Sequence, residues 1–180
     1  MRKLVSHLFI SLDGVVEAPN RFLRPEQYGD LDAFHEDTIG GQDAVLMGRR
    51  TYEEWSAFWP TSDIQPFAGF INAVPKYVVS RSLRTVDWPG ATLLPGDLND
   101  EITALKAQPG QAIGVHGSIG LVQSLLVASL LDELRFILCP AAVGHGRRLL
   151  DRDGDPIQLD LQSARTTPNG LQYMALRPRA

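Results

Sequence analysis

The chain has 180 residues, with 17 lysines plus arginines against 21 aspartates plus glutamates, so its formal net charge is −4. Apolar residues make up 44% and charged residues 21%, the balance of an ordinary globular protein with one core. A single cysteine excludes a disulfide scaffold, and without a long apolar run, a signal peptide or a basic tract we expect a cytoplasmic protein that binds neither membranes nor nucleic acid.

The first quarter of the chain predicts a strand, a long loop, a helix and a second strand. Residues 4–12 have apolar side chains at both parities, which indicates an interior strand buried on both faces. Residues 14–29 predict the loop, and residues 30–39 have the apolar spacing of a short helix. Residues 44–48 predict the next buried strand, and a helix begins at Arg49.

The middle of the chain continues this alternation of strands and helices. Four strands are predicted at residues 76–80, 91–94, 112–115 and 132–139, and two helices at residues 97–107 and 118–129. The last strand–helix–strand unit should cross over right-handed, so that its strands run parallel.

Beyond Pro140 the pattern changes to two extended runs. Residues 157–167 and 171–177 flank Asn169-Gly170, a dipeptide typical of hairpin turns. The sequence therefore predicts an α/β fold in one domain, residues 1–180, with a mostly parallel sheet, flanking helices and an antiparallel C-terminal hairpin.

The strongest local motif is Gly48-Arg49-Arg50-Thr51, where a buried strand ends and a helix begins. In open α/β sheets ligands collect beyond the carboxyl ends of strands, and unpaired N–H groups in a helix's first turn attract anions. The motif fits phosphate binding. It fits equally a solvated helix start whose arginines pair with surface carboxylates.

Two further motifs follow predicted strands. Ser80-Arg81-Ser82 could hold a terminal phosphate such as the 2′-phosphate of NADP, although a serine-rich turn is the simpler interpretation. At the start of a helix, His116-Gly117-Ser118-Ile119-Gly120 could admit a pyrophosphate, or Ser118 could act as a plain helix cap.

Acidic residues supply candidates for proton handling. Asp13 ends the first strand and could orient a substrate, although a bond to its own turn is the commoner role of such a residue. Asp30, Asp32 and Asp37 lie on the predicted 30–39 helix, where most such runs are solvated. One inward carboxylate could promote protonation of a ring.

Other chemistry-bearing residues fit structural roles. The four histidines lack metal-ligand spacing, so we expect no metal site. His7 fits a strand residue with a satisfied hydrogen bond, and Cys139 a small core side chain. Trp55 and Trp59 lie four apart on one helix and fit packing.

The motifs together resemble the dihydrofolate reductase-like superfamily, in the branch of the reductase domain of the bifunctional riboflavin-biosynthesis deaminase/reductase. The matching segments occur in the family's order: Ser11–Gly14, Leu46–Glu53, Pro75–Ser80, Val115–Ser118 with Leu121-Val122, Asp132–Arg135, and Pro140 through Gly144, Gly146 and Leu149.

The resemblance implies a dihydrofolate reductase-like fold with NADPH as hydride donor. It places the cofactor phosphates at the Gly48–Thr51 motif, the 2′-phosphate at Ser80–Ser82 and the pyrophosphate at Gly117–Gly120. It places the nicotinamide near Val16. Asp13 and Asp32 remain the candidates for the catalytic proton.

The function implied is an NADPH-dependent reductase of a small heterocycle, carbonyl or imine, similar to the uracil-derivative reductase of riboflavin biosynthesis. A true dihydrofolate reductase is an alternative, less favoured because that family has two adjacent glycines where this chain has His116-Gly117. A second alternative is a non-catalytic NADP-binding module that acts as a homodimer, with the apolar run 125–131 as its surface. Burial of that run in the monomer explains it equally well.

Overall fold

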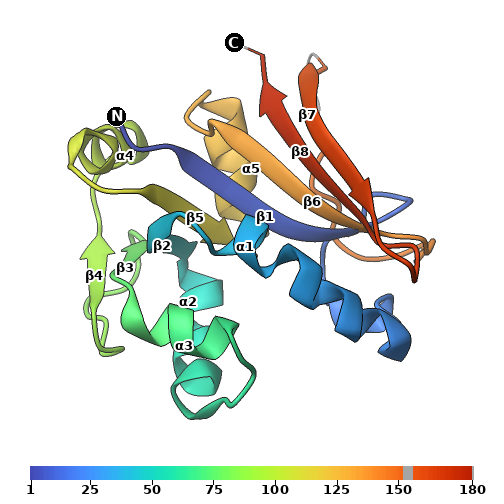
Figure 1. The fold of residues 1–180 in the computed structure, drawn as a ribbon. Coiled ribbons are helices and arrows are strands. Elements are labelled where there is room, and N and C mark those ends of the chain that lie inside the picture. The colour runs from blue at the N-terminus through green and yellow to red at the C-terminus, as the bar shows by residue number, and fades with distance from the viewer. Residues whose placement is uncertain (152–155, 180) are drawn as a thin grey trace.

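The computed structural model describes residues 1–151 and 156–179, and their strands form one twisted sheet (Figure 1). In the described part of the chain its eight strands have the order β4-β3-β2-β5-β1-β6-β8-β7. The strands are β1 (Leu4–Ser11), β2 (Gln42–Gly48), β3 (Lys76–Val79), β4 (Ala91–Leu94), β5 (Ala112–His116), β6 (Glu133–Cys139), β7 (Leu159–Thr166) and β8 (Gln172–Pro178).

Strand directions confirm the predicted architecture. The pairs from β4 to β6 are parallel, and β5 and β6 both pair with β1, which lies between them. β8 then pairs antiparallel with both β6 and β7, as the predicted C-terminal hairpin requires.

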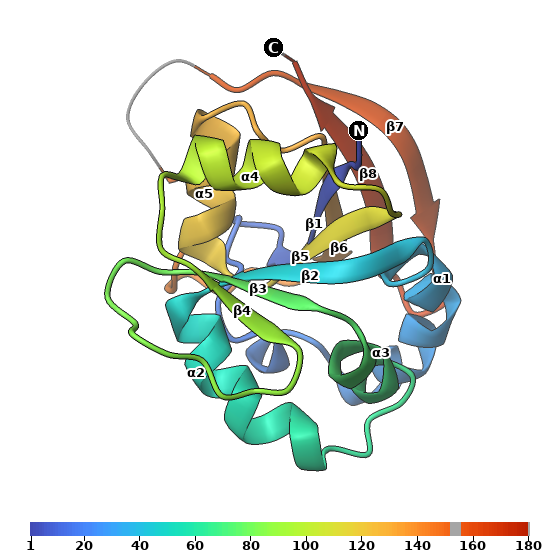
Figure 2. The same cartoon turned by 90° about the vertical axis from the view of Figure 1, so that its left-hand side faces the viewer.

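Helices lie on both faces of the sheet. They are α1 (His35–Thr38), α2 (Arg49–Phe58), α3 (Phe67–Ala73), α4 (Leu98–Ala107) and α5 (Ile119–Val127), with 3-10 segments η1 (Pro19–Arg21), η2 (Pro25–Phe34) and η3 (Trp59–Thr61). Figure 2 shows α4 and α5 on one side of the sheet, here called the closed face, and α2 and α3 on the other, here called the open face. No helix within residues 1–151 or 156–179 combines the length and apolarity needed to cross a membrane.

The closed face is sealed by one apolar cluster. Leu8 of β1, Ile102 of α4 and Leu125 of α5 belong to this cluster, and all three are buried. The run 125–131 contributes Leu125, Leu126 and Leu131 to the same core, so burial in the monomer accounts for most of it. Val127 alone of its aliphatic residues is strongly exposed, at 62%.

The open face has two separate apolar clusters. One lies over β2 and β3, where α2 and α3 pack on Met47 and Val78. The other lies over β6 and β8, where Phe34 of η2 packs near Tyr173. Between them the central strands β1 and β5 present His7 and His116 on this face, and this gap positions the candidate site.

Two helical elements differ from the prediction, one in its start and one in not having been predicted. The predicted helix at residues 30–39 begins earlier, at Pro25, and runs as η2 before the single turn of α1, so the predicted loop 14–29 is shorter. Pro25 in the first helical position and the Gln27 side chain, which accepts from the amide of Arg24 at 3.0 Å, explain the earlier start. The helix α3 was not predicted at all.

Candidate functional site

A cavity of about 890 Å³ opens on the open face, beyond the carboxyl ends of the central strands. Its floor includes His7 of β1 and His116 of β5, and one wall comes from η2 and α1. The N-terminal turns of α2 and α5 form a second side, and Trp59 and Phe67 belong to a third. The cavity therefore lies where α/β sheets usually bind their ligands.

Two predicted binding motifs meet at this cavity. The amide of Gly48 donates to Oγ of Ser118 at 3.0 Å, and this hydroxyl donates to Oγ1 of Thr51 at 2.7 Å. Gly117 and Ser118 have positive φ values of 66° and 45°, a conformation costly for a serine unless its surroundings hold it. The hydrogen bonds hold the first turns of α2 and α5 side by side, where unpaired N–H groups favour an anion.

Three arginines line the cavity, and they differ in charge pairing. Arg49 forms a bidentate pair with Glu53 at 3.0 Å, one turn along α2. The guanidinium groups of Arg50 and Arg147 form no ion pair among residues 1–151 and 156–179. Arg147 was not predicted, yet its Nη2 would lie 3.7 Å from a Cβ added at Gly120, so it reaches the start of α5.

The loop after β1 holds Arg147 in place. The amide of Val16 donates to the Arg147 carbonyl at 3.0 Å, and the Arg147 amide donates to Oε2 of Glu17 at 3.2 Å. Val16 itself lines the cavity, as the resemblance implied for a nicotinamide neighbour. This loop therefore places one apolar and one cationic side chain at the same rim.

The cavity floor is built from two stacked imidazoles and an amide. The His7 and His116 rings lie 4.9 Å apart at 14°, and the side chain of Gln42 hydrogen-bonds to both rings at 2.9 Å. A Cβ at Gly114 would overlap Oε1 of Gln42, so only glycine leaves room for this amide. Burial lowers the pKa of His7 well below its usual value and that of His116 to about 3, so both rings are neutral near pH 7.

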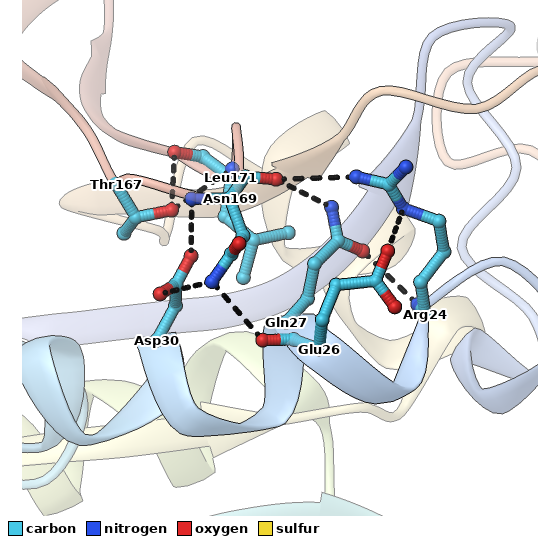
Figure 3. Close-up of polar contacts among 7 residues, drawn as sticks. All are labelled: Arg24, Glu26, Gln27, Asp30, Thr167, Asn169 and Leu171. Carbon is cyan, nitrogen blue, oxygen red and sulfur yellow. Dashed lines mark hydrogen bonds and ion pairs between the residues drawn. The ribbon is translucent and has the colours of Figure 1, made fainter.

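The η2 wall of the cavity is tied to the C-terminal hairpin (Figure 3). Asp30 accepts from the amide and side chain of Asn169 at 3.1 and 3.0 Å, and Nε2 of Gln27 donates to the Asn169 carbonyl at 3.0 Å. Hydrogen bonds from Thr167 and Asn169 lower the pKa of Asp30. These contacts of Gln27 and Asp30 with Asn169 are here called the hairpin latch, and Asp30 is thus a structural residue of it.

The predicted cofactor-binding residues fall into two groups. Those that line the cavity are Val16, Gly48, Arg49, Arg50, Thr51, His116, Gly117, Ser118, Ile119 and Gly120. Ser80, Arg81 and Ser82 do not line it; they follow β3, one strand beyond β2 at the same edge of the sheet. Oγ of Ser80 accepts from the amides of Ser82 and Leu83, and Arg81 is exposed, so the 2′-phosphate role stays a prediction.

The two predicted catalytic carboxylates lie outside the cavity lining. Asp13 accepts from the amides of Val143 and Gly144 and from Oγ of Ser11, bonds that hold the pKa of its carboxyl well below the usual range. Asp32 is 81% exposed at its side chain and faces Nδ1 of His35 at 3.4 Å. We therefore assign catalysis to neither residue.

Sequence reasoning missed several cavity residues. His7, Trp55 and Trp59 were interpreted as structural, yet all three line the cavity. The available signal was parity, because His7 breaks the apolar pattern of β1 on the same face as Gly114 and His116 of the paired strand. The role of Trp59 depends on a tertiary contact with Phe67, for which the sequence has no signal.

Comparisons with known proteins agree with this architecture. A family model described as the RibD C-terminal domain matches residues 2–173. The protein YyaP of Bacillus subtilis (strain 168) is 25% identical over 174 residues, which cover 94% of this chain and 92% of YyaP. The match confirms the family resemblance inferred from the motifs.

Solved structures show the same fold at low sequence identity. A pyrimidine reductase-like protein from Corynebacterium diphtheriae has a TM-score of 0.71 and 15% identity, covering 99% of this chain and 92% of that one. Dihydrofolate reductase from Enterococcus faecalis, solved as a complex with NADP(H), has a TM-score of 0.65 and 13% identity, covering 99% and 97%. These structures confirm the dihydrofolate reductase-like fold.

Proposed function

The chain belongs to the RibD C-terminal domain family, and from that premise we propose that it is an NADPH-dependent reductase of a small heterocyclic, carbonyl or imine substrate. The observation that supports this most directly is the convergence of the α2 and α5 first turns beside Arg50 and Arg147, at the rim of a cavity lined in part by aromatic rings. Such a site combines anion binding with stacking. A reduced dinucleotide needs both.

The residues present fit that cofactor. Its phosphates would be held by the first-turn amides of α2 and α5 and by Arg50 and Arg147, whose guanidinium groups form no ion pair among the described residues. Arg81, exposed after the neighbouring strand β3, would contact the 2′-phosphate. When bound, the cofactor supplies the hydride.

The protein contributes position and environment to such a reaction. Val16 at the rim and the aromatic wall around Phe67 would confine the reacting rings and exclude water. The neutral imidazoles of His7 and His116 provide a polar floor without adding a charge. Orientation in a dry, preorganised cavity is the main contribution that we assign to this chain.

Binding and turnover test the proposal separately. In a thermal-shift titration NADPH should raise the melting temperature more than NADH, because ligand that binds only the native state stabilises by RT ln(1 + [L]/Kd). Arg81→Ala should reduce the difference between the stabilisation by NADPH and that by NADH. Equal stabilisation by both cofactors in the native protein would contradict the NADP assignment.

Two alternatives make different predictions. A dihydrofolate reductase should oxidise NADPH with dihydrofolate, but the two carboxylates nearest the expected position, Asp30 and Asp32, lie outside the cavity lining, and Asp30 is committed to the hairpin latch. A non-catalytic module should bind NADPH and turn over none of a panel of pteridines, pyrimidines and ketones. Steady NADPH oxidation with any one pyrimidine would support the reductase over both.

A further inference from the structure

Two loops that border the cavity, one after β1 and one after β6, pair with each other. Val15 and Arg148 form an antiparallel bridge between them, and the amide of Val16 donates to the carbonyl of Arg147. Each loop contributes one of these side chains to the cavity lining, Val16 from the first and Arg147 from the second. Whatever holds the two loops together therefore also decides which side chains reach the cavity.

The second loop carries two adjacent arginines with different surroundings. Arg147 lines the cavity and reaches Gly120 at the start of α5. Arg148 does not line it: its Nε donates to the carbonyl of Asp13 at 2.8 Å, and its Nη2 lies 3.6 Å from Oδ2 of Asp13. Successive side chains at a β-bridge point to opposite sides of the chain, so a bond that fixes Arg148 also directs Arg147.

Both loops converge on the carboxylate of Asp13. This carboxylate accepts from the amides of Val143 at 3.0 Å and Gly144 at 2.8 Å, and from Oγ of Ser11 at 2.7 Å. The hydroxyl of Ser11 in turn accepts from the amide of Val15 at 3.0 Å. The bond from Val143, with those from Ser11 and Gly144, holds the pKa of the carboxyl below its usual range, so Asp13 is ionised near pH 7. A carboxylate with both oxygens bonded inside the protein is an anchor.

The two loops also approach each other too closely to move independently. Gly146 has a φ of 126°, and a Cβ added there would lie 2.8 Å from Cγ1 of Val15. Glycine is therefore required at this point of contact. A displacement of the loop after β1 is transmitted to the loop that carries Arg147.

We propose that Asp13 is a positioning residue that determines which of the two adjacent arginines faces the cavity. It binds Arg148 and the backbone of residues 143–144, and so directs Arg147 at the first turn of α5. Asp13 itself lies outside the cavity lining and acts only through Arg147. This role rests on the proposed function in that the cofactor phosphates are the groups that Arg147 would meet, but the orientation of Arg147 is measurable in the free protein.

The first experiment opposes this role to simple electrostatics. Asp13→Asn makes the chain one unit less negative, so Coulomb attraction alone predicts tighter binding of the anionic NADPH. Positioning predicts that NADPH binds about threefold to fivefold more weakly in calorimetry, because one solvent-screened cation loses its place. Asp32→Asn makes the same charge change at an exposed carboxylate outside the lining and should not weaken binding. Unchanged or tighter binding in folded Asp13→Asn would overturn the inference.

A double-mutant cycle then shows whether Asp13 acts through Arg147. In the Arg147→Gln background Asp13→Asn should weaken NADPH by less than about 1.5-fold, whereas in the Arg50→Gln background it should keep its full effect. Equal losses in both backgrounds indicate a merely structural role and would overturn the inference. Arg148→Lys keeps the net charge and loses the Nε donor, so it should follow the same pattern more weakly. It serves in the cycle if Asp13→Asn does not fold.

NMR of the free protein separates this inference from the proposed function. The side-chain protons of Arg147 should show nuclear Overhauser contacts with Gly120 in the native protein, and Asp13→Asn should lose them; Arg148→Lys should weaken them. Contacts that persist in both variants would overturn the inference, whatever NADPH does. If the contacts depend on Asp13 but the native protein binds no NADPH, the reductase assignment fails and the positioning role of Asp13 stands.

Discussion

The two faces of the sheet are made from the same strands and differ in what fills them. On the closed face Leu4 and Leu8 of β1 join one continuous cluster with α4 and α5. On the open face the intervening positions of the same strand include His7, and the apolar clusters stop on either side of it. Alternation along one strand thus separates a face that is filled by the core from a face that carries the cavity.

Between its two apolar clusters the open face is polar, and this polar floor requires a glycine and buried polar side chains. Gly114 of β5 leaves the space in which Gln42 reaches both imidazoles. Its neighbours in the strand, Ile113 and Val115, belong to the apolar cluster of the closed face. Buried polar groups cost free energy unless they are paired, so this floor adds less stability than an apolar one of equal area. The comparison predicts that mutations on the two faces separate stability from binding.

The largest effect should come from the closed face. Leu125→Ala removes a fully buried side chain from α5 and should lower the free energy of unfolding by about 2–5 kcal/mol, the usual range for such cavities. Urea unfolding measures it, and NADPH affinity of the folded variant should be unchanged. Val127→Ala, at an exposed position of the same helix, is the control and should shift stability by no more than about 0.5 kcal/mol. Comparable losses of unfolding free energy in Leu125→Ala and Val127→Ala would contradict the stabilising role of the closed face.

On the open face stability should depend on pH. Burial depresses the folded-state pKa of His7 and His116, with His116 and Arg135 adding to the effect on His7. Below about pH 6.5 these histidines bind protons in the unfolded chain and not in the folded one. Each should therefore lower the free energy of unfolding by up to about 1.4 kcal/mol per pH unit as the pH falls. Above about pH 6.5 this stabilisation is fully present.

The matched variant for this pH dependence is His116→Phe. Urea unfolding at about pH 7.5 and about pH 5 should give a smaller difference for His116→Phe than for the native protein, because one of the two titrating rings is gone. Leu125→Ala, on the closed face, should keep the native pH dependence. An unaltered pH dependence in His116→Phe would show that the floor histidines are not the titrating groups.

A smaller effect should come from the wall of the cavity. Gln27 is fully buried, donates to the Asn169 carbonyl and accepts from the amide of Arg24 at 3.0 Å (Figure 3). Gln27→Ala should cost about 1–3 kcal/mol, because it leaves buried backbone groups unpaired. It should also weaken ligands of the cavity, since η2 forms one wall. Gln27→Glu replaces the donor by a carboxylate oxygen that faces the Asn169 carbonyl, so near neutral pH it should be at least as destabilising as Gln27→Ala. Full stability in Gln27→Ala would show that the latch does not hold this wall.

Sequence patterns predicted the sheet well because strand periodicity is local. The predicted strand at residues 76–80 matches β3 closely, and the hairpin formed where Asn169-Gly170 indicated it. The helix α3 was not predicted because its end depends on the buried ammonium of Lys76, which donates to the carbonyl of Ile71 in the last turn and to that of Val74 just after it. Short helices depend on such contacts more than on propensity.

The candidate site was likewise predictable only where local rules apply. Glycine and hydroxyl motifs at strand ends were predicted from local rules, and Gly48, Thr51 and Ser118 do meet at the cavity. His116 was a candidate, but the contact of Gln42 with His7 and His116 could not be predicted, because the three residues come from three strands and meet only in the observed register. Their individual letters fit ordinary strand positions.

The smallest effect concerns charge at the rim of the open face. Arg50→Gln and Arg147→Gln should each weaken NADPH by about fivefold, close to 1 kcal/mol, because an exposed, solvent-screened cation contributes little more than that to an anion. Arg49→Gln should change affinity less than about twofold, since Glu53 already neutralises Arg49. Calorimetry at low and high salt measures all three, and the losses for Arg50 and Arg147 should shrink at high salt. If Arg49→Gln is the most damaging of the three, the carboxylate pair opens on binding, and pairing in the free protein does not decide which arginines bind the phosphates.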